Sequence, residues 1–384
     1  MSPAASASVA PGPPSKLAAL GLIYAWGALH DITYLPTGLM TRNWRIVTDA
    51  GVHALKELRD ASPSTARRNL RVLARLIDLG VPGCRPRMTR NGDSVAEIDQ
   101  TGFMMTSWLD GHHLRGRDLT LDQAHELGRV IARLHDSLRH LGTTEGLPAP
   151  PEQLRAQVTE TEAAVAKADH YLAAAEAGNT PFDTQVTEIL HRRKLLINKV
   201  ADERPRTHVP AGPHGWIHGD LQHRNILWAP TVGHDHNILR VAGILDWDRI
   251  RIRPFGEELV RTATIQFGSE RGALDLVRIN AFTRGYRTIL PLDDNEVTDA
   301  VERLWWKRLT DYWHLDFHYD RGDTSCDDLF LSGEETLHWW TNRRDEVKQA
   351  FTSCRFSSPM TDSHDLGSRV GGSAMVTRID GRGA

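Results

Sequence analysis

Three polar residues of this chain have the types and the spacing that phosphoryl transfer needs. Asp220 and Asn225 belong to the segment His-Gly-Asp-Leu-Gln-His-Arg-Asn at residues 218–225, and Asp246 follows in Ile-Leu-Asp-Trp-Asp at residues 244–248. Transfer of a γ-phosphoryl group to a hydroxyl needs a carboxylate that receives or orients the hydroxyl proton, and hard oxygen ligands for Mg²⁺. Asp220 suits the first role, and Asn225 with Asp246 suits the second.

The intervening sequence predicts a hairpin that brings the two metal-ligand candidates together. An apolar run at residues 226–228 and a second run at residues 238–245 are separated by a turn-rich segment. Two such runs around turn residues are typical of paired antiparallel strands. Asn225 would lie at one strand end and Asp246 at the other, so both could face one site.

These motifs resemble those of the aminoglycoside phosphotransferase and choline kinase superfamily. The shared features are His-x-Asp-x-x-x-x-Asn, with the Asp-to-Asn spacing of the kinase catalytic loop, and the downstream Ile-x-Asp-Trp-Asp. Asp246-Trp247-Asp248 stands where protein kinases have Asp-Phe-Gly, which favours the small-molecule branch. The resemblance implies an α+β, bilobal, protein-kinase-like fold. A small N-terminal lobe with an antiparallel sheet and one helix would precede a larger, mainly helical lobe.

A nucleotide-binding half is expected upstream. The order strand, loop, strand, turn, strand is predicted over residues 32–38, 44–48 and 53–58. By the resemblance, Lys56 in the third strand would pair with the nucleotide phosphates. The loop before the second strand has one glycine, Gly38, so backbone N–H groups and Thr41 or Asn43 are the other candidate phosphate contacts.

The helix expected next departs from the family pattern. Pro63 to Leu79 reads as an amphipathic helix capped by Ser62. In the family this helix usually carries a glutamate that pairs with the strand lysine, but here it contains none. Either another carboxylate, such as Glu57 or Asp60, orients Lys56, or the lysine is held differently.

Ser107, Trp108 and Leu109 are the candidates for the hinge where an adenine would meet the backbone, after two further predicted strands. The alternative is that Trp108 simply fills a core gap. The chain then turns helical. Helices are predicted over residues 121–138, 151–177, 187–200, 295–315 and 333–351. His135 is expected to be a structural histidine near the catalytic loop rather than a ligand, and the resemblance implies that His218 supports this loop.

An acidic and aromatic region near the C-terminus allows two interpretations. It includes five tryptophans and five aspartates: Trp305, Trp306, Trp313, Trp339, Trp340, Asp316, Asp320, Asp323, Asp327 and Asp328. Carboxylates and aromatic faces suit an ammonium-bearing acceptor through charge pairing and cation–π contact. The simpler interpretation, which we favour, is core tryptophans beside a solvated acidic loop.

Composition limits the partners. The net charge is −3 and no polybasic segment suggests nucleic acid. Nineteen histidines are scattered without zinc-ligand spacing, and three cysteines (Cys84, Cys326 and Cys354) give no disulfide framework. The apolar segment Leu17 to Leu29 is too short to span a membrane and predicts a helix packed under the small lobe of a cytoplasmic enzyme.

The sequence therefore predicts disordered tails at 1–16 and 357–384, a nucleotide-binding lobe at 17–109 and a catalytic and acceptor-binding lobe at 110–356. The predicted activity is Mg²⁺-dependent transfer of a γ-phosphate, from ATP or GTP, to a hydroxyl of a small acceptor such as an aminoglycoside or another antibiotic. The alternatives are a metabolic amino-alcohol or sugar kinase similar to choline or homoserine kinases, a nucleotide-binding pseudokinase, and a protein kinase. No nucleic-acid or membrane partner is expected, and the oligomeric state stays open.

Overall fold

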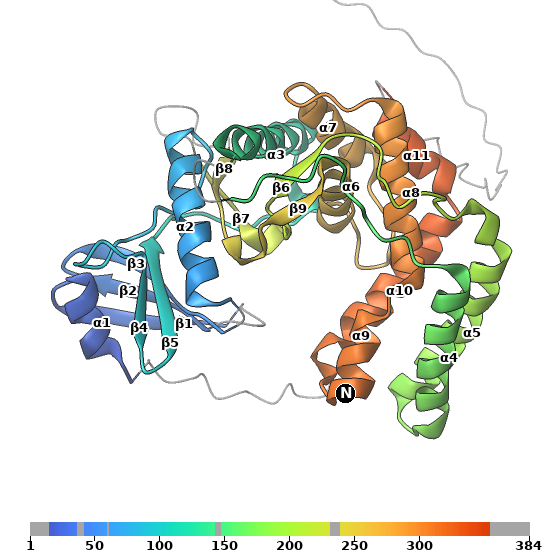
Figure 1. Cartoon of the computed structure of the whole chain (residues 1–384), viewed down its shortest axis with the longest axis horizontal. Coiled ribbons are helices and arrows are strands. Elements are labelled where there is room, and N and C mark those ends of the chain that lie inside the picture. Colours follow the sequence, from blue (N-terminus) through green and yellow to red (C-terminus); the bar gives the residue numbers. More distant parts are fainter. Residues whose placement is uncertain (1–14, 37–41, 60, 143–146, 231–238, 354–384) are drawn as a thin grey trace, which may run out of the picture.

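The computed structural model describes residues 15–36, 42–59, 61–142, 147–230 and 239–353. Two lobes lie side by side, with the sheet-bearing lobe at the left of Figure 1 and the helical lobe at its right. A five-stranded sheet dominates the small lobe, and helices dominate the larger one. The predicted α+β, two-lobed architecture is confirmed.

The sheet of the small lobe is antiparallel throughout and has the order β1-β2-β3-β5-β4. Its strands are β1 (Leu29–Leu35), β2 (Arg42–Thr48), β3 (Gly51–Glu57), β4 (Val95–Ile98) and β5 (Thr101–Ser107). Helix α1 (Leu17–Tyr24) packs Leu20 and Tyr24 into a core that also contains Trp44 and Met105. An apolar N-terminal helix under the small lobe was predicted and is present.

Helix α2 (Pro63–Asp78) joins the small lobe to the larger one. The Oγ of Ser62 accepts a hydrogen bond from the N–H of Thr65 (3.2 Å), and proline occupies the first helical position. Leu70 and Leu73 on its apolar face are buried in the large hydrophobic core of the other lobe. The predicted capping signals thus mark the real start of the helix.

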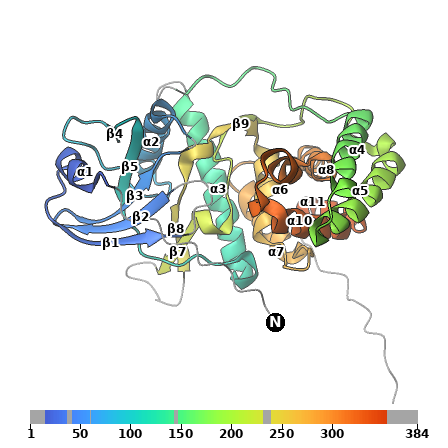
Figure 2. The same cartoon turned by 90° about the horizontal axis from the view of Figure 1, so that it is seen from below.

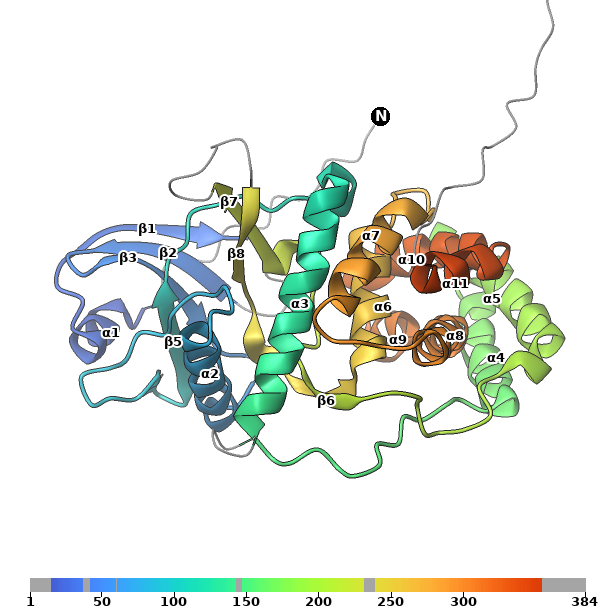
Figure 3. The ribbon, with the colours of Figure 1, turned by 90° about the horizontal axis from the view of Figure 1, so that it is seen from above.

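Helices α3 (Leu121–Leu141) and α7 (Leu276–Arg287) pack closely along each other, with α3 on the side of the small lobe (Figure 3). A Cβ atom at Gly128 of α3 would lie 2.0 Å from a backbone oxygen of α7, and one at Gly285 of α7 would lie 1.9 Å from a backbone oxygen of α3. The helices can approach this closely because both positions lack a side chain.

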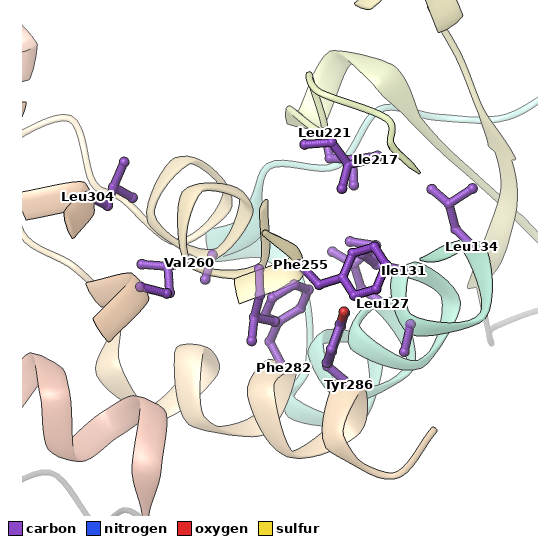
Figure 4. Close-up of a cluster of buried hydrophobic side chains, with 14 of the residues drawn as sticks. Leu127, Ile131, Leu134, Ile217, Leu221, Phe255, Val260, Phe282, Tyr286 and Leu304 are labelled. Atoms are coloured by element: carbon purple, nitrogen blue, oxygen red, sulfur yellow. The ribbon is translucent and has the colours of Figure 1, made fainter. Parts of the chain in front are cut away.

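The larger lobe is built around a core that α3, α6 and α7 share, with Leu127, Phe255 and Tyr286 at its centre (Figure 4). Its short strands are β6 (His214–Ile217), β7 (Ile226–Pro230), β8 (Leu239–Ile244) and β9 (Arg251–Pro254). Its other helices are α4 (Thr161–Ala177), α5 (Pro181–Lys199), α6 (Phe255–Gln266), α8 (Asp294–Thr310), α9 (Trp313–Leu315), α10 (Asp327–Thr341) and α11 (Arg344–Thr352). Helices α4 and α5 lie at the end away from the small lobe (Figure 2), in a second core with α10.

Two predicted helix starts were wrong. The helix expected from residue 151 begins only at Thr161, because the preceding segment is extended and Ala156 N donates to His208 O (2.7 Å). The helix expected from Thr187 begins at Pro181, where Thr180 and Asp183 form a capping box. The first helix begins later than predicted because the preceding segment pairs with another part of the chain, and the second begins earlier because of a capping box that the prediction missed.

The two long helices predicted near the C-terminus are each broken. Helix α8 ends at Thr310 and is followed by the short α9 and a π-helical turn, Asp316–Asp320. The second prediction spans α10 and α11, which are separated at residues 342–343. Asp327 and Asp328, expected in a loop, lie in the first turn of α10, where carboxylates interact favourably with the helix dipole.

Some predictions concern residues outside the described ranges. These are Gly38, Thr41, Asp60, Cys354, the predicted C-terminal tail and most of the N-terminal one. Within that N-terminal segment Lys16 is described, and its Nζ donates to Ile98 O (2.7 Å). In the described part of the chain, no helix combines the length and the apolar character needed to cross a membrane.

Candidate active site

Asp220 and Asn225 meet in the loop between β6 and β7. The loop ends in a 3₁₀ turn, His223–Asn225, which leads directly into β7. Asn225 Nδ2 donates to Asp220 O (2.8 Å) and contacts Asp220 Oδ2 at 3.3 Å. The amide oxygen of Asn225 takes part in neither contact and stays available for another partner.

The predicted hairpin β7–β8 places Asp246 beside this loop. β7 and β8 are antiparallel, and Leu245 N donates to Asn225 O (2.8 Å) just before Asp246. The φ angle of Asp246 is 61°, in the left-handed region that non-glycine residues rarely adopt. Aspartate tolerates this conformation better than most residues, and such strain concentrates at functional sites.

Lys56 reaches across from the small lobe to the same place. Its Nζ lies 2.8 Å from Asp246 Oδ1 and 2.6 Å from Asp248 Oδ2, and the residue is 7% exposed. Burial opposes the charged form of Lys56, but the two carboxylates outweigh it and raise the pKa of Lys56. Burial likewise opposes ionisation of Asp246, but Lys56 lowers the pKa of that carboxyl. The pair is therefore charged at neutral pH.

A buried carboxylate, Glu258 on α6, holds the start of the loop that contains Asp220 and Asn225. Its Oε2 accepts from His218 N (3.0 Å) and lies 2.8 Å from His135 Nε2, and its Oε1 accepts from Gly219 N. Burial opposes ionisation, but His135 and these donors lower the pKa of Glu258. Burial also lowers the pKa of His218 and favours its neutral form. Both histidines therefore stand where the sequence predicted, as supports of the loop.

Arg261, one helical turn after Glu258 on α6, contacts Asp220 directly. Arg261 Nη2 lies 3.2 Å from Asp220 Oδ1, while Gln222 Nε2 lies 3.2 Å from Asp220 Oδ2. The side chain of Asp220 is 18% exposed. The carboxylate is thus held from both oxygens and is still reachable by a small molecule.

The arrangement offers a carboxylate for a hydroxyl proton, two neighbouring oxygen donors and a buried ammonium group. The oxygens of Asn225 and Asp246 are of the hard type that Mg²⁺ prefers, and two protein ligands suffice when phosphate oxygens and water complete the shell. The described residues contain no group of three or more His, Cys, Asp or Glu side chains arranged to hold a metal ion.

The sequence model of the phosphotransferase enzyme family matches residues 31–292, which is more than half of the chain. The chain belongs to this family. It is therefore a phosphotransferase of protein-kinase-like fold that uses an alcohol group as acceptor.

Curated relatives of this family member are homoserine kinases. The enzyme of Methylobacillus flagellatus is 23% identical over 298 residues, which cover 76% of this chain and 82% of the relative. The enzyme of Burkholderia cenocepacia is 24% identical over 315 residues, which cover 76% and 83%.

Similar solved structures show the same fold at low identity. A spectinomycin phosphotransferase in complex with ADP and spectinomycin has a TM-score of 0.56 and 16% identity, covering 89% of this chain and 98% of the other. A microcompartment-associated aminopropanol kinase has a TM-score of 0.55 and 16% identity, covering 87% and 99%.

The predicted nucleotide contacts that fall in the described residues lie on β2, on β3, and at the end of β5 and just after it. Asn43 of β2 pairs with Lys56 of β3 in the strand register. In the hinge segment, Ser107 N donates to Arg85 O (2.8 Å) and Trp108 N donates to Val52 O (3.1 Å). Both N–H groups are therefore already used, whereas the carbonyl groups of these two residues and the backbone of Leu109 take part in neither bond.

The partner of Lys56 differs from the carboxylates considered first. Glu57 lies 3.9 Å from Arg42 instead. The lysine is held by Asp246 and Asp248, and α2 contributes Asn69, whose Nδ2 donates to Trp247 O (2.8 Å). Lys56 is therefore paired with two carboxylates of the segment 246–248, and α2 holds this segment through the side-chain amide of Asn69.

The acidic and aromatic region is occupied by its own contacts. Trp305, Trp306 and Trp340 are at most 1% exposed and belong to the core. Asp316 accepts from the hydroxyl of Tyr171, and other carboxylates of the region contact histidine or tyrosine side chains. This supports the core interpretation over an ammonium-binding surface.

Sequence reasoning missed Glu258, Arg261 and Asn69 as residues of the site. Glu258 had one usable signal, since it is a carboxylate one turn into a helix that follows the Asp-Trp-Asp motif. Arg261 and Asn69 had none, because a single polar residue on a helix is most often solvated.

Proposed function

We propose that this chain transfers the γ-phosphate of a nucleoside triphosphate to a hydroxyl of a small molecule, with the site formed by Asp220, Asn225, Asp246 and Lys56. The observation that carries the proposal is the continuous set of contacts that joins these four residues, from both lobes, across 190 positions of sequence between Lys56 and Asp246. The small lobe at 17–109 would serve the nucleotide, and the lobe at 110–356 the acceptor.

Asp220 would orient the acceptor hydroxyl and receive its proton at a carboxylate oxygen. Arg261, Gln222 and Asn225 fix that carboxylate, so less ordering is needed when the acceptor arrives. Their contacts use both oxygens only at 3.2–3.3 Å, a length at which a hydroxyl can compete.

On the donor side, Lys56 would steady the phosphates, and the backbone of Leu109 would meet the base. Asn43 lies beside Lys56 in the sheet, while Gly38 and Thr41 complete the proposed phosphate contacts. When bound, Mg²⁺ would neutralise charge on the phosphate oxygens, held by Asn225 and Asp246. A solved relative of the fold binds ADP, which supports a nucleotide donor.

The second candidate is a pseudokinase, and the only sequence feature in its favour was the missing glutamate of α2. Because Lys56 is paired with two other carboxylates, the missing glutamate no longer favours a pseudokinase. Relatives named homoserine kinase and fold neighbours named for spectinomycin and aminopropanol all suggest a small hydroxylated acceptor.

The test is release of the nucleoside diphosphate, ADP from Mg²⁺-ATP or GDP from Mg²⁺-GTP. Wild type, Asp220→Asn and Asp136→Asn are assayed against aminoglycosides, other hydroxylated antibiotics, amino alcohols, hydroxyamino acids and sugars. Asp136 is a partly exposed residue of α3, with a side chain that is 42% exposed, and serves as the matched control. We expect Asp220→Asn to lower turnover by about 10²–10⁴ while nucleotide binding persists. Equal turnover in the two variants would refute the role of Asp220.

A further inference from the structure

Arg308 on α8 is a mostly buried cation that lacks a carboxylate partner among the described residues. Its Nη2 donates to Thr264 Oγ1 of α6 at 3.2 Å, and its Nε is buried without a hydrogen bond. Burial, together with the like charge of Arg261, lowers the pKa of Arg308 to about 10. Arg308 therefore remains charged at neutral pH, beside another arginine.

Three other arginines of this lobe that are buried or partly buried have carboxylate partners. Arg193 lies 2.7 Å from Glu334, Arg303 lies 2.7 Å from Asp299, and Arg344 contacts both Glu203 and Glu302. Buried charges are costly unless they are paired, and this chain pairs these three. Among the described residues Arg308 has no such carboxylate, and its guanidinium carbon lies 6.0 Å from the centre of the Trp340 ring.

The position of Arg308 connects it to the reacting hydroxyl. Its partner Thr264 follows Arg261 by three residues on α6, so the two are neighbours on one helix face. Arg261 in turn contacts Asp220 Oδ1. One helical turn, about 5 Å, therefore separates the residue at the catalytic carboxylate from the residue that Arg308 touches.

The positive charge continues around Arg261. Arg251 on β9 donates from Nη2 to Gly219 O (3.3 Å), and its buried Nε has no hydrogen-bond partner in the described ranges. Burial and the neighbouring Arg253 and Arg261 lower the pKa of Arg251. Two buried guanidinium nitrogens without acceptors thus flank Arg261, the residue at Asp220.

The donor phosphates have separate partners. Asn225 contacts Asp220 at Oδ2 and belongs to the group of residues that includes Asp246 and Lys56. Arg261 contacts Asp220 at the other oxygen, Oδ1. Arg308 is on α8 and contacts α6 at Thr264, one helical turn beyond Arg261. Arg308 is therefore connected to Asp220 through the Oδ1 side, and Lys56 through the Oδ2 side.

We propose that Arg308, with Arg261, forms a subsite for an anionic group of the acceptor, a carboxylate or a phosphate carried a few bonds from the hydroxyl that is phosphorylated. This rests on the proposed kinase function and specifies its substrate class. The subsite selects against polycationic acceptors such as aminoglycosides, because their ammonium groups would meet like charge.

The test compares acceptors that differ only in the anion. Homoserine is paired with 3-aminopropan-1-ol, which has the same hydroxyl and amine but no carboxylate. Glycerol is compared with glycerate and glycerol 3-phosphate, so that carboxylate and phosphate are distinguished. Turnover with Mg²⁺-ATP is measured for each, together with thermal stabilisation of the Mg²⁺-ADP-loaded protein, which needs no turnover.

The variants are Arg308→Met, which keeps the apolar stem, Arg308→Lys, which keeps the charge, and Lys307→Met as the matched control. Lys307 precedes Arg308 on α8, is 56% exposed and lies 3.8 Å from Glu257. We expect Arg308→Met to fold, because it removes an uncompensated buried charge. Arg308→Lys provides a second variant that retains the fold and the charge.

We expect the anionic member of at least one set to be favoured, and Arg308→Met to lower its kcat/KM about ten- to a hundredfold, mainly through KM. Arg308→Lys should lose less, and Lys307→Met should match wild type. Equal use of neutral and anionic acceptors, or equal losses on both in Arg308→Met, would overturn the subsite. The subsite would also be overturned if anionic ligands raised the melting temperature of wild type no more than that of Arg308→Met. Anion-dependent stabilisation without any phosphoryl transfer would instead leave the subsite intact and refute the kinase function.

Discussion

Replacement of Glu258 by glutamine should destabilise the catalytic loop although it changes only one atom. The carboxylate accepts at Oε1 from Gly219 N and at Oε2 from His218 N, with His135 Nε2 also at Oε2. An ionised carboxylate only accepts, so Nε2 of His135 must carry the proton, and Nδ1 faces the hydroxyl of Tyr286 at 2.7 Å. All three groups that meet Glu258 are therefore donors.

A glutamine cannot accept from all three donors. With its NH₂ at the Oε2 position two donors are opposed, and with its NH₂ at Oε1 only Gly219 N is opposed, so the second orientation is favoured. One charge-assisted hydrogen bond is then lost and one buried N–H is left unpaired. We expect the free energy of unfolding to fall by about 2–4 kcal/mol, which corresponds to a urea midpoint lower by about 1 M.

The assay is urea unfolding followed by tryptophan fluorescence, with turnover measured in parallel. Glu257→Gln is the matched control, because Glu257 is the preceding residue and makes a 3.8 Å surface contact with Lys307. Such a pair contributes about 0–1 kcal/mol. If the two variants unfold at the same urea concentration, Glu258 does not support the loop as described.

The pH dependence gives an independent check. Folding lowers the pKa of Glu258 below its ordinary value of 4.5, so its stabilisation is fully present above that value and is lost as the pH falls through the folded-state pKa. The stability gap between wild type and Glu258→Gln should therefore be constant near neutrality and shrink below about pH 4.5. A gap that stays constant down to pH 3 would contradict ionised Glu258 as the cause.

Further predictions concern the lysine site and the helix packing. Lys56→Met should raise the KM for nucleotide at least tenfold in a steady-state assay, since a charge-assisted contact to phosphate is lost. Asp248→Asn should raise the same KM by a smaller factor, because Asp246 still holds the lysine. Asn69→Ala should lower turnover several-fold at unchanged secondary structure by circular dichroism, because the loop of Trp247 loses its helix contact. Gly128→Ala should lower the melting temperature, since its Cβ would meet a backbone oxygen at 2.0 Å, whereas Gly333→Ala in open space on α10 should raise it through about 0.5–1 kcal/mol of helix propensity.

Features of this protein that depend only on residues close together in the sequence could be predicted from the sequence. The Asp220-to-Asn225 spacing, the hairpin that returns to Asp246 and the start of α2 at Ser62 were all predictable, because turn chemistry, alternation and capping act over a few residues. The same local rules gave the strand that carries Lys56. They did not give the breaks after α8 and α10, since periodic apolar residues continue across both.

Only the tertiary structure decided which charges meet. Lys56 and Asp248 are 192 positions apart, and Glu258 reaches the loop of His218 from another element. The same holds for Arg308, since only the packing of α8 against α6 shows that it has no carboxylate partner in the described part of the chain. Such contacts depend on how helices and lobes pack around shared cores, and no local pattern in the chain encodes the partner of a buried charge.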